Sequence, residues 1–292
     1  EKHVESVAFR ALQVGYRHID TAEGYRNQAG IGRAIKRAFS EGILNSRDDL
    51  FLTSKVWPGA KIWNQKVKSY DEVLQTCRKS LNSLQLDSVD LYLLHVPLSG
   101  KDARLEQWRA MLELKCQGLA KSIGVSNYGV QHLQEIEEAG LELPCTNQIE
   151  LHPLCQQRDL VAYMQARNIK PIAYSSLAPL SNWRADYAKP VGSRPYADRN
   201  DGLEDPLLGS SEIDSIARRL KVSKAQVLLR YGLQKGYPVL PKSTQETRLL
   251  ENLNLTSFEI PEHDMALLDD LPQSHPLAYG RQGKPFDPTL CA

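Results

Sequence analysis

Cysteine is scarce in this sequence and follows no metal-binding or disulfide spacing. The five cysteines form no CxxC pair, and their number is odd. Such a set is typical of free thiols in a reducing compartment, so we expect no disulfide framework, no cysteine-based metal site and a cytoplasmic location. The cysteines are Cys77, Cys116, Cys145, Cys155 and Cys291.

Net charge and long apolar runs are lacking too. The formal net charge of +1 leaves no electrostatic footprint for nucleic acid or an anionic membrane. No apolar run is long enough to span a bilayer, and the residues that follow Glu1 do not read as a secretory signal. We therefore expect a small-molecule substrate, with no nucleic acid or membrane as partner.

Short apolar runs alternate along the chain with apolar residues at helical spacing. The 292 residues are 41 % hydrophobic and 24 % charged, as in a globular protein, and no linker divides them. Strands that alternate with helices predict parallel pairing, so we expect one α/β domain over 1–292. The expected strands are 16–21, 49–57, 89–96, 122–127, 146–151, 171–177 and 237–243.

Two parallel architectures compete for these seven strands. A closed (β/α)₈ barrel, or TIM barrel, needs eight strands, and the chain begins directly in a helical pattern. An open doubly wound sheet usually shows a glycine-rich turn after an early strand. The nearest match, "GIGRAI" from Gly30, lacks the third glycine and lies on an expected helix. We favour the barrel, with its first strand absent from this sequence.

Polar side chains close the apolar runs of successive expected strands. In a parallel barrel the carboxyl ends of the strands meet at one mouth, where the chemistry gathers. Any one such residue is more often a turn residue or a solvated charge, but a series of them predicts a site. The series comprises Asp20, Tyr25, Lys55, His95, Ser126, Asn127, Gln148, Glu150, Tyr174, Ser175, Lys242 and Ser243.

Four of these residues suit proton donation to an oxyanion. A tyrosine has a reference pKa of about 10, and a nearby ammonium favours the phenolate and lowers that pKa. Lys55 is the candidate ammonium for Tyr25, and Asp20 is its counter-charge. Neutral His95 is a hydrogen-bond donor for a substrate oxygen. The set contains no carboxylate pair, nucleophile with a base, or metal cluster.

Seven motifs together resemble the successive motifs of the aldo-keto reductase family. They occur in the family's order and cover the chain to about Leu271. The resemblance implies a (β/α)₈ barrel that binds NADPH without a Rossmann domain, and it implies a catalytic tetrad of Asp20, Tyr25, Lys55 and His95 with Tyr25 as general acid. The motifs are "GYRHIDTAEGYRN", "LTSKVWP", "LYLLHVP", "GVSNY", "NQIELHP", "AYSSL" and "LPKSTQETRLLENLN".

The same resemblance assigns the cofactor contacts. It implies that Ser126, Asn127 and Gln148 hold the nicotinamide carboxamide and that Tyr174 stacks on its ring. Ser175 and Leu177 match contacts on the pyrophosphate side. The residues that match the adenosine end are Lys242, Ser243, Arg248, Glu251 and Asn252.

Two cations at the adenosine end favour NADPH over NADH. Lys242 and Arg248 lie near an expected helix N-terminus, which suits a ribose 2′-phosphate. An NAD site would favour a carboxylate that binds the ribose diol. We therefore expect NADPH as cofactor. The competing interpretation of each cation is a solvated surface charge, and we favour the phosphate site.

The sequence departs from the family where the substrate would lie. Val96 follows His95, where many members have tryptophan. Trp57 is a candidate wall of the substrate pocket, beside His95. The stretch 179–211 resembles the loop that covers the cofactor. The tail 272–292 resembles the variable C-terminal loop, from which Tyr279 or Phe286 would line the pocket.

The expected activity is reduction of an aldehyde or ketone by NADPH, with the protein as a monomer. One alternative is a non-catalytic NADPH-binding regulatory subunit of the same fold, which the intact tetrad disfavours. Another is an aldolase that uses Lys55 as a Schiff base, which leaves Tyr25 and Arg248 unexplained.

Overall fold

A computed structural model describes most of the chain. It covers residues 2–177, 180, 211–273, 280–281, 284–285 and 287–291. The predicted cofactor-covering loop 179–211 lies outside the described residues except for Leu180 and Ser211, and Tyr279 and Phe286 also lie outside them.

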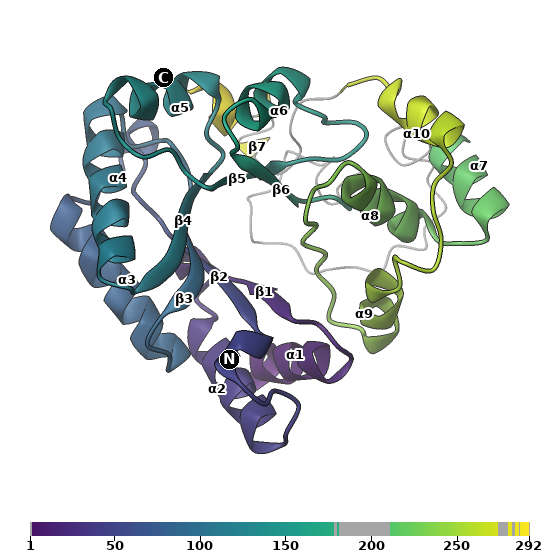
Figure 1. Ribbon diagram of the computed structural model, residues 1–292, viewed down its shortest axis with the longest axis horizontal. Coiled ribbons are helices and arrows are strands. Elements are labelled where there is room, and N and C mark those ends of the chain that lie inside the picture. Colours follow the sequence, from purple (N-terminus) through teal and green to yellow (C-terminus); the bar gives the residue numbers. More distant parts are fainter. Residues whose placement is uncertain are drawn as a thin grey trace.

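Six parallel strands form one curved sheet in which spatial order follows chain order (Figure 1). Each strand pairs in parallel with the next one along the chain. Helices follow the strands and lie on the outer face, as βα repeats require. The strands are β1 (His18–Asp20), β2 (Phe51–Val56), β3 (Val89–Leu94), β4 (Ala120–Ser126), β5 (Thr146–Glu150) and β6 (Lys170–Tyr174).

The seventh expected strand is reduced to a short parallel contact with β6. Val239 bridges Ala173, with N–O distances of 2.8 Å from Ala173 to Pro238 and 3.2 Å from Leu240 to Ala173. Leu240 packs against Leu91, Leu93 and Ile172, which come from β3 and β6, so this segment faces the interior of the curved sheet. The six strands curl into a half-barrel that this segment extends, and the fold is of the predicted TIM-barrel type.

The other edge of β1 has no partner strand among the described residues. The sheet order ends at β1, and the first described element is helix α1 (Lys2–Gln13). Residues of α1 and of 239–244 instead line one cavity on that side.

Local sequence signals explain where several helices begin. Ser223 and Gln226 form the predicted capping box of α8, with each side chain 3.1 Å from the other's backbone nitrogen. Ser69 and Glu72 form another at α3. The helices are α2 (Gln28–Ser40), α3 (Tyr70–Leu84), α4 (Lys101–Cys116), α5 (Val130–Glu138), α6 (Arg158–Gln165), α7 (Ser211–Leu220), α8 (Lys224–Gln234), α9 (Glu246–Leu253) and α10 (Glu262–Asp269).

The main core lies between the sheet and its outer helices. All six residues of β3 are buried, which explains the near-continuous apolar run at this point of the sequence. Trp108 and Met111 of α4 are fully buried in the same cluster. A second cluster joins α7, α8 and α10. These two cores hold the strand ends, and thus the predicted site residues, in place.

The end of the chain docks beside the start of α5. The described tail contains a short antiparallel pair, β7 (Gly280–Arg281) with β8 (Lys284–Pro285), and the turn η6 (Pro288–Leu290). A β-carbon on Gly129 would lie only 1.9 Å from the Thr289 carbonyl oxygen, so glycine permits this approach. His132 contacts the Cys291 carbonyl oxygen, and Cys291 packs near Trp57.

Candidate active site

The four predicted tetrad residues meet at the carboxyl ends of β1, β2 and β3. Asp20 ends β1, Lys55 lies near the end of β2, His95 follows β3, and Tyr25 lies in the turn η1 (Glu23–Tyr25). The Lys55 ammonium pairs with the Asp20 carboxylate and donates to the Thr21 carbonyl oxygen at 3.2 Å. Its nitrogen lies 3.5 Å from the Tyr25 hydroxyl oxygen. Side chains distant in sequence are therefore brought together as predicted.

Lys55 and Asp20 form the electrostatic centre of the site. The Lys55 side chain is fully buried and the Asp20 side chain is 13 % exposed. Burial lowers the pKa of Lys55, whereas the charge and hydrogen bond of Asp20 oppose that shift. Gln148 donates its amide to the other Asp20 oxygen at 2.8 Å. The carboxylate is thus held from two sides.

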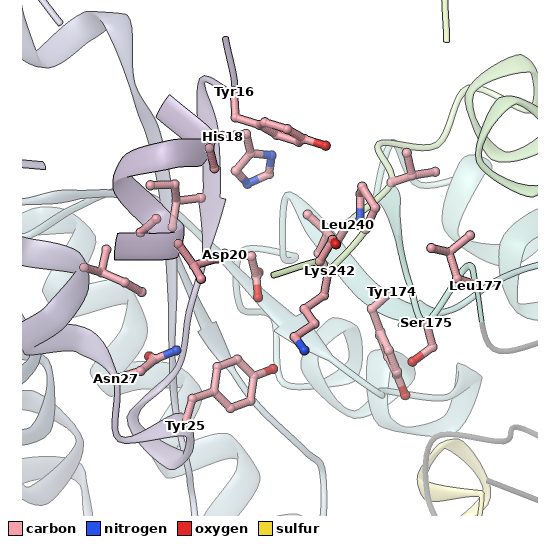
Figure 2. A pocket seen from close by; sticks show the side chains of 18 of the residues that line it. Tyr16, His18, Asp20, Tyr25, Asn27, Tyr174, Ser175, Leu177, Leu240 and Lys242 are labelled. Atoms are coloured by element: carbon pink, nitrogen blue, oxygen red, sulfur yellow. The ribbon is translucent and has the colours of Figure 1, made fainter. Parts of the chain in front are cut away.

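The pKa of Tyr25 is raised, which corrects the expectation that Lys55 lowers it. Burial of the phenol raises this pKa first, and the negative charge of Asp20 raises it further. The Asp20 carboxylate offsets the pull of the Lys55 ammonium on the phenolate. Although Tyr25 is 48 % exposed overall, its hydroxyl end faces the cavity (Figure 2). The phenol therefore keeps its proton at neutral pH, as a general acid must.

His95 is a buried neutral imidazole beside the phenol. Burial lowers its pKa to about 3, and the Lys55 charge lowers it in the same direction. The His95 ring packs edge-on to Tyr25 and to Trp57, with ring centroids 5.6 Å and 5.5 Å apart. Its Nδ1 has no hydrogen-bond partner within the described part of the chain. A neutral ring in this place donates a hydrogen bond to an oxygen without competing for the proton.

Trp57 is flanked by a second tryptophan that sequence reasoning missed. Trp63 stacks on Trp57 with centroids 6.0 Å apart and an interplanar angle of 13°. Trp57 also donates from Nε1 to Gln65 at 2.8 Å. Val96, Leu98 and Cys291 belong to the same cluster. Trp63 does not lie at the end of an expected strand, so its stacking on Trp57 is seen only in the folded loop.

The residues predicted at the nicotinamide carboxamide form one hydrogen-bonded group. The Ser126 hydroxyl donates to the Gln148 carbonyl oxygen at 2.8 Å, and the Asn127 amide donates to the His95 carbonyl oxygen at 3.0 Å. Tyr174 donates its hydroxyl to the Asn127 side chain at 2.7 Å. This group joins the carboxyl ends of β4, β5 and β6 directly to the tetrad.

A cavity of about 720 Å³ connects the tetrad to the 239–244 segment. Figure 2 shows Tyr25, Tyr174, Ser175 and Lys242 around it. Leu177 and Ser243 also contribute to its lining. On the side of α1 the lining consists of Val4, Val7, Ala8 and Ala11 together with His3.

The other residues predicted at the adenosine end lie on α9, outside the lining of this cavity. Arg248 is exposed and Asn252 is buried. The Glu251 carboxylate accepts a hydrogen bond from Ser223, the residue before α8. The roles of these three residues toward a cofactor stay predictions.

The described residues offer neither a metal-binding cluster nor a membrane-spanning helix. They contain no group of three side chains that could hold a metal ion. They also contain no helix long and apolar enough to cross a membrane.

Comparison with known sequences identifies the family. The profile of the Aldo/keto reductase family matches residues 1–272. The chain therefore belongs to the aldo/keto reductase family. It is an oxidoreductase of the kind that acts on aldehydes and ketones, as the resemblance of its motifs implies.

Individual relatives agree along nearly the whole chain. Glyoxal reductase of Bacillus subtilis is 36 % identical over 261 residues, which cover 89 % of this chain and 80 % of the relative. The NADH-dependent D-xylose reductase of Candida parapsilosis is 35 % identical over 288 residues, with 90 % and 83 % covered. The crystal structure of a Bombyx mori aldo-keto reductase in complex with NADP has a TM-score of 0.78 at 30 % identity, with 97 % of this chain and 89 % of that chain covered.

Proposed function

We propose that this chain reduces an aldehyde or ketone to the alcohol, with NADPH as hydride donor and Tyr25 as general acid. The observation that carries the proposal is the convergence of Asp20, Tyr25 and His95 on one cavity, with the buried Lys55 nitrogen behind them, 3.5 Å from the Tyr25 oxygen. A protonated phenol beside an ammonium suits an oxygen that gains negative charge.

The residues around the cavity fit a nicotinamide cofactor. Asn127 and Gln148 offer amide groups for a carboxamide, and Tyr174 offers an aromatic face in the same wall. Ser175 and Leu177 continue that wall toward Lys242 and Ser243. When bound there, NADPH supplies the hydride for the carbonyl carbon.

The side chains of this chain handle the proton and the orientation of the substrate. Neutral His95 donates a hydrogen bond that orients the carbonyl oxygen. Tyr25 transfers its proton to that oxygen as negative charge develops. The Lys55 ammonium stabilises the resulting phenolate, and Asp20 holds Lys55 in place. Solvent then returns the proton to Tyr25.

The preference for NADPH depends on Lys242 and Arg248. Lys242 lines the cavity, and Arg248 lies in the first turns of α9. Two cations near a helix N-terminus favour a phosphate on the ribose. The α9 segment is thus the proposed site of the 2′-phosphate.

A carbonyl panel tests the proposed function. The parent protein should oxidise NADPH when it is given glyoxal, benzaldehyde or D-xylose. Tyr25→Phe should lose at least about a thousandfold in kcat while it binds NADPH with unchanged affinity. If Tyr25→Phe reduces these carbonyls at the parental rate, the assignment of the acid is wrong. NADPH binding by the parent without turnover of any carbonyl would favour a regulatory role.

We also propose that the protein acts as a monomer in the cytoplasm. The five cysteines are all free in the structure, which supports a reducing compartment. Light scattering of the purified protein tests the oligomeric state, and a mass of twice 32.9 kDa would contradict it.

A further inference from the structure

Glu23 links the turn that carries Tyr25 to the loop that carries Trp57. It lies two residues before Tyr25 in η1. One of its carboxylate oxygens accepts the Trp57 backbone N–H at 2.9 Å. The Lys68 ammonium lies 3.1 Å and 3.3 Å from its two oxygens. The carboxylate therefore binds both ends of the loop that follows β2.

Lys68 closes this connection from the other side. Its ammonium also donates to the Trp57 carbonyl oxygen at 2.8 Å. Its backbone oxygen accepts from the Gln107 amide at 2.9 Å, and its backbone nitrogen donates to Pro58 at 2.9 Å. Gln107 is fully buried in α4. Lys68 is thus a fixed point, and its side chain is only 21 % exposed.

We propose that Glu23 and Lys68 are positioning residues for the reduction, which fix the Tyr25 phenol and the Trp57 ring relative to each other beside His95. This inference rests on the proposed function. Neither residue touches the reacting atoms, and both act through Tyr25 and Trp57. The pair would set the distance between the proton donor and the aromatic wall of the substrate pocket.

The other hydrogen bonds of the turn around Tyr25 are mostly local, with backbone bonds of 3.1 Å from Tyr25 to Ala22 and from Arg26 to Glu23. Thr21 donates its hydroxyl to Asn27 at 2.6 Å, which ties together the two ends of the segment 21–27. Gly24 lies between Glu23 and Tyr25, and a β-carbon there would meet no atom within 4 Å. Glycine leaves the backbone free to change conformation. The bonds of the Glu23 carboxylate to Trp57 and Lys68 therefore restrain a turn whose backbone Gly24 leaves flexible.

The contacts of His95 with Tyr25 and Trp57 explain why the restraint would affect catalysis. The His95 ring packs edge-on against both Tyr25 and Trp57. A displacement of about 1 Å in a positioned group can cost as much as a hundredfold in rate. Release of Glu23 would let the phenol and the indole shift independently.

Four variants test the pair. Glu23→Ala should lower kcat about tenfold, raise KM for benzaldehyde more than KM for glyoxal, and leave NADPH affinity and thermal midpoint unchanged. Glu23→Gln keeps an acceptor for the Trp57 N–H, so it should recover part of the lost kcat. Lys68→Met should change the same parameters in the same direction. Lys66→Met is the matched control, because it removes the Lys66–Glu72 pair from the same loop without contact to Glu23.

The outcomes separate this inference from the proposed function. Loss of kcat in Glu23→Ala, with recovery in Glu23→Gln and no change in Lys66→Met, supports the positioning role. If Glu23→Ala keeps the parental kcat and the parental ratio of KM for benzaldehyde to KM for glyoxal, the positioning role is overturned. The proposed function still holds in that case, because the parent remains active. Equal losses in Lys66→Met and Lys68→Met also overturn the positioning role, because they show a general effect of the loop. A parent that reduces no carbonyl overturns both.

Discussion

At the scale of single residues, the Lys55–Asp20 pair dominates the energetics of the site. Lys55 is buried without exposure, and its ammonium is balanced mainly by one carboxylate. A buried charge that has lost its partner strongly lowers the free energy of unfolding, whereas replacement of both charges by neutral side chains lowers it little. The pair therefore affects stability as well as the reaction.

Removal of one partner should cost more than removal of both. Lys55→Met leaves the Asp20 carboxylate without its cation, so we expect a loss of about 3 kcal/mol in the free energy of unfolding. The double variant Asp20→Asn with Lys55→Met should recover most of that loss. Urea unfolding measures both, and a double variant no more stable than the single one would contradict this account.

His95 should make the protein sensitive to acid. Its folded pKa of about 3 lies below the reference value of 6.5, so the unfolded chain binds the proton more tightly. The free energy of unfolding is unaffected above pH 6.5 and falls by about 1.4 kcal/mol per pH unit below that, until the loss levels off near pH 3. His95→Gln should therefore lose less stability than the parent between pH 6.5 and pH 4. Identical slopes in urea titrations across this range would show that His95 is not held neutral.

At the scale of elements, the site residues lie at the carboxyl ends of strands, and most of these strand ends can be recognised in the sequence. Apolar runs closed by Asp20, Lys55 and His95 were sufficient to predict three strands and their convergence. The capping box at Ser223 likewise predicted the start of α8. These signals lie within short segments, so they can be recognised before the fold is known.

Features that depend on contacts between distant elements could not be predicted. The raised pKa of Tyr25 results from its burial and from the placement of Asp20, neither of which is visible in the spacing. Glu23 looks like an ordinary surface carboxylate, because its partners Trp57 and Lys68 lie 34 and 45 positions further along. The docking of Cys291 on α5 depends on the lack of a side chain at Gly129, which the sequence does not distinguish from other glycines.

Substitution of Gly129 should release the end of the chain. In Gly129→Ala the new β-carbon would overlap the Thr289 carbonyl oxygen, so the 287–291 segment must move away from α5. We expect Cys291, now half-buried, to react several-fold faster with a maleimide, as located by peptide mass spectrometry. Cys116 is already exposed and should react at the parental rate. An unchanged rate at Cys291 would show that Gly129 does not hold the tail.

At the scale of the whole molecule, one cavity connects the tetrad with the 239–244 segment. Its wall includes residues at or after the carboxyl ends of β1, β3, β4 and β6, together with Gln148 in β5. This is the surface on which we propose that an extended cofactor lies, with the nicotinamide at the tetrad and the adenosine end toward α9. The resemblance of motifs spread over the whole chain is consistent with this, because six of the seven motifs supply part of the wall.

The adenosine end should decide the choice of nucleotide. Lys242→Met and Arg248→Met should each weaken NADPH binding about tenfold, while NADH binding changes little, because only NADPH carries the 2′-phosphate. Fluorescence titration at two salt concentrations measures this, and the variants should show a smaller salt dependence. Lys79→Met on α3 is the control. An equal loss of affinity for NADPH and for NADH would contradict the proposed phosphate site.

The most direct test of the central claim is single-turnover transfer from NADPH deuterated at its transferable position to benzaldehyde. The account predicts benzyl alcohol with deuterium on carbon in the parent, and no transfer in Tyr25→Phe although NADPH remains bound. Deuterium transfer by Tyr25→Phe at the parental rate would contradict the role of the phenol. Absence of deuterium from the alcohol in the parent would contradict hydride transfer itself.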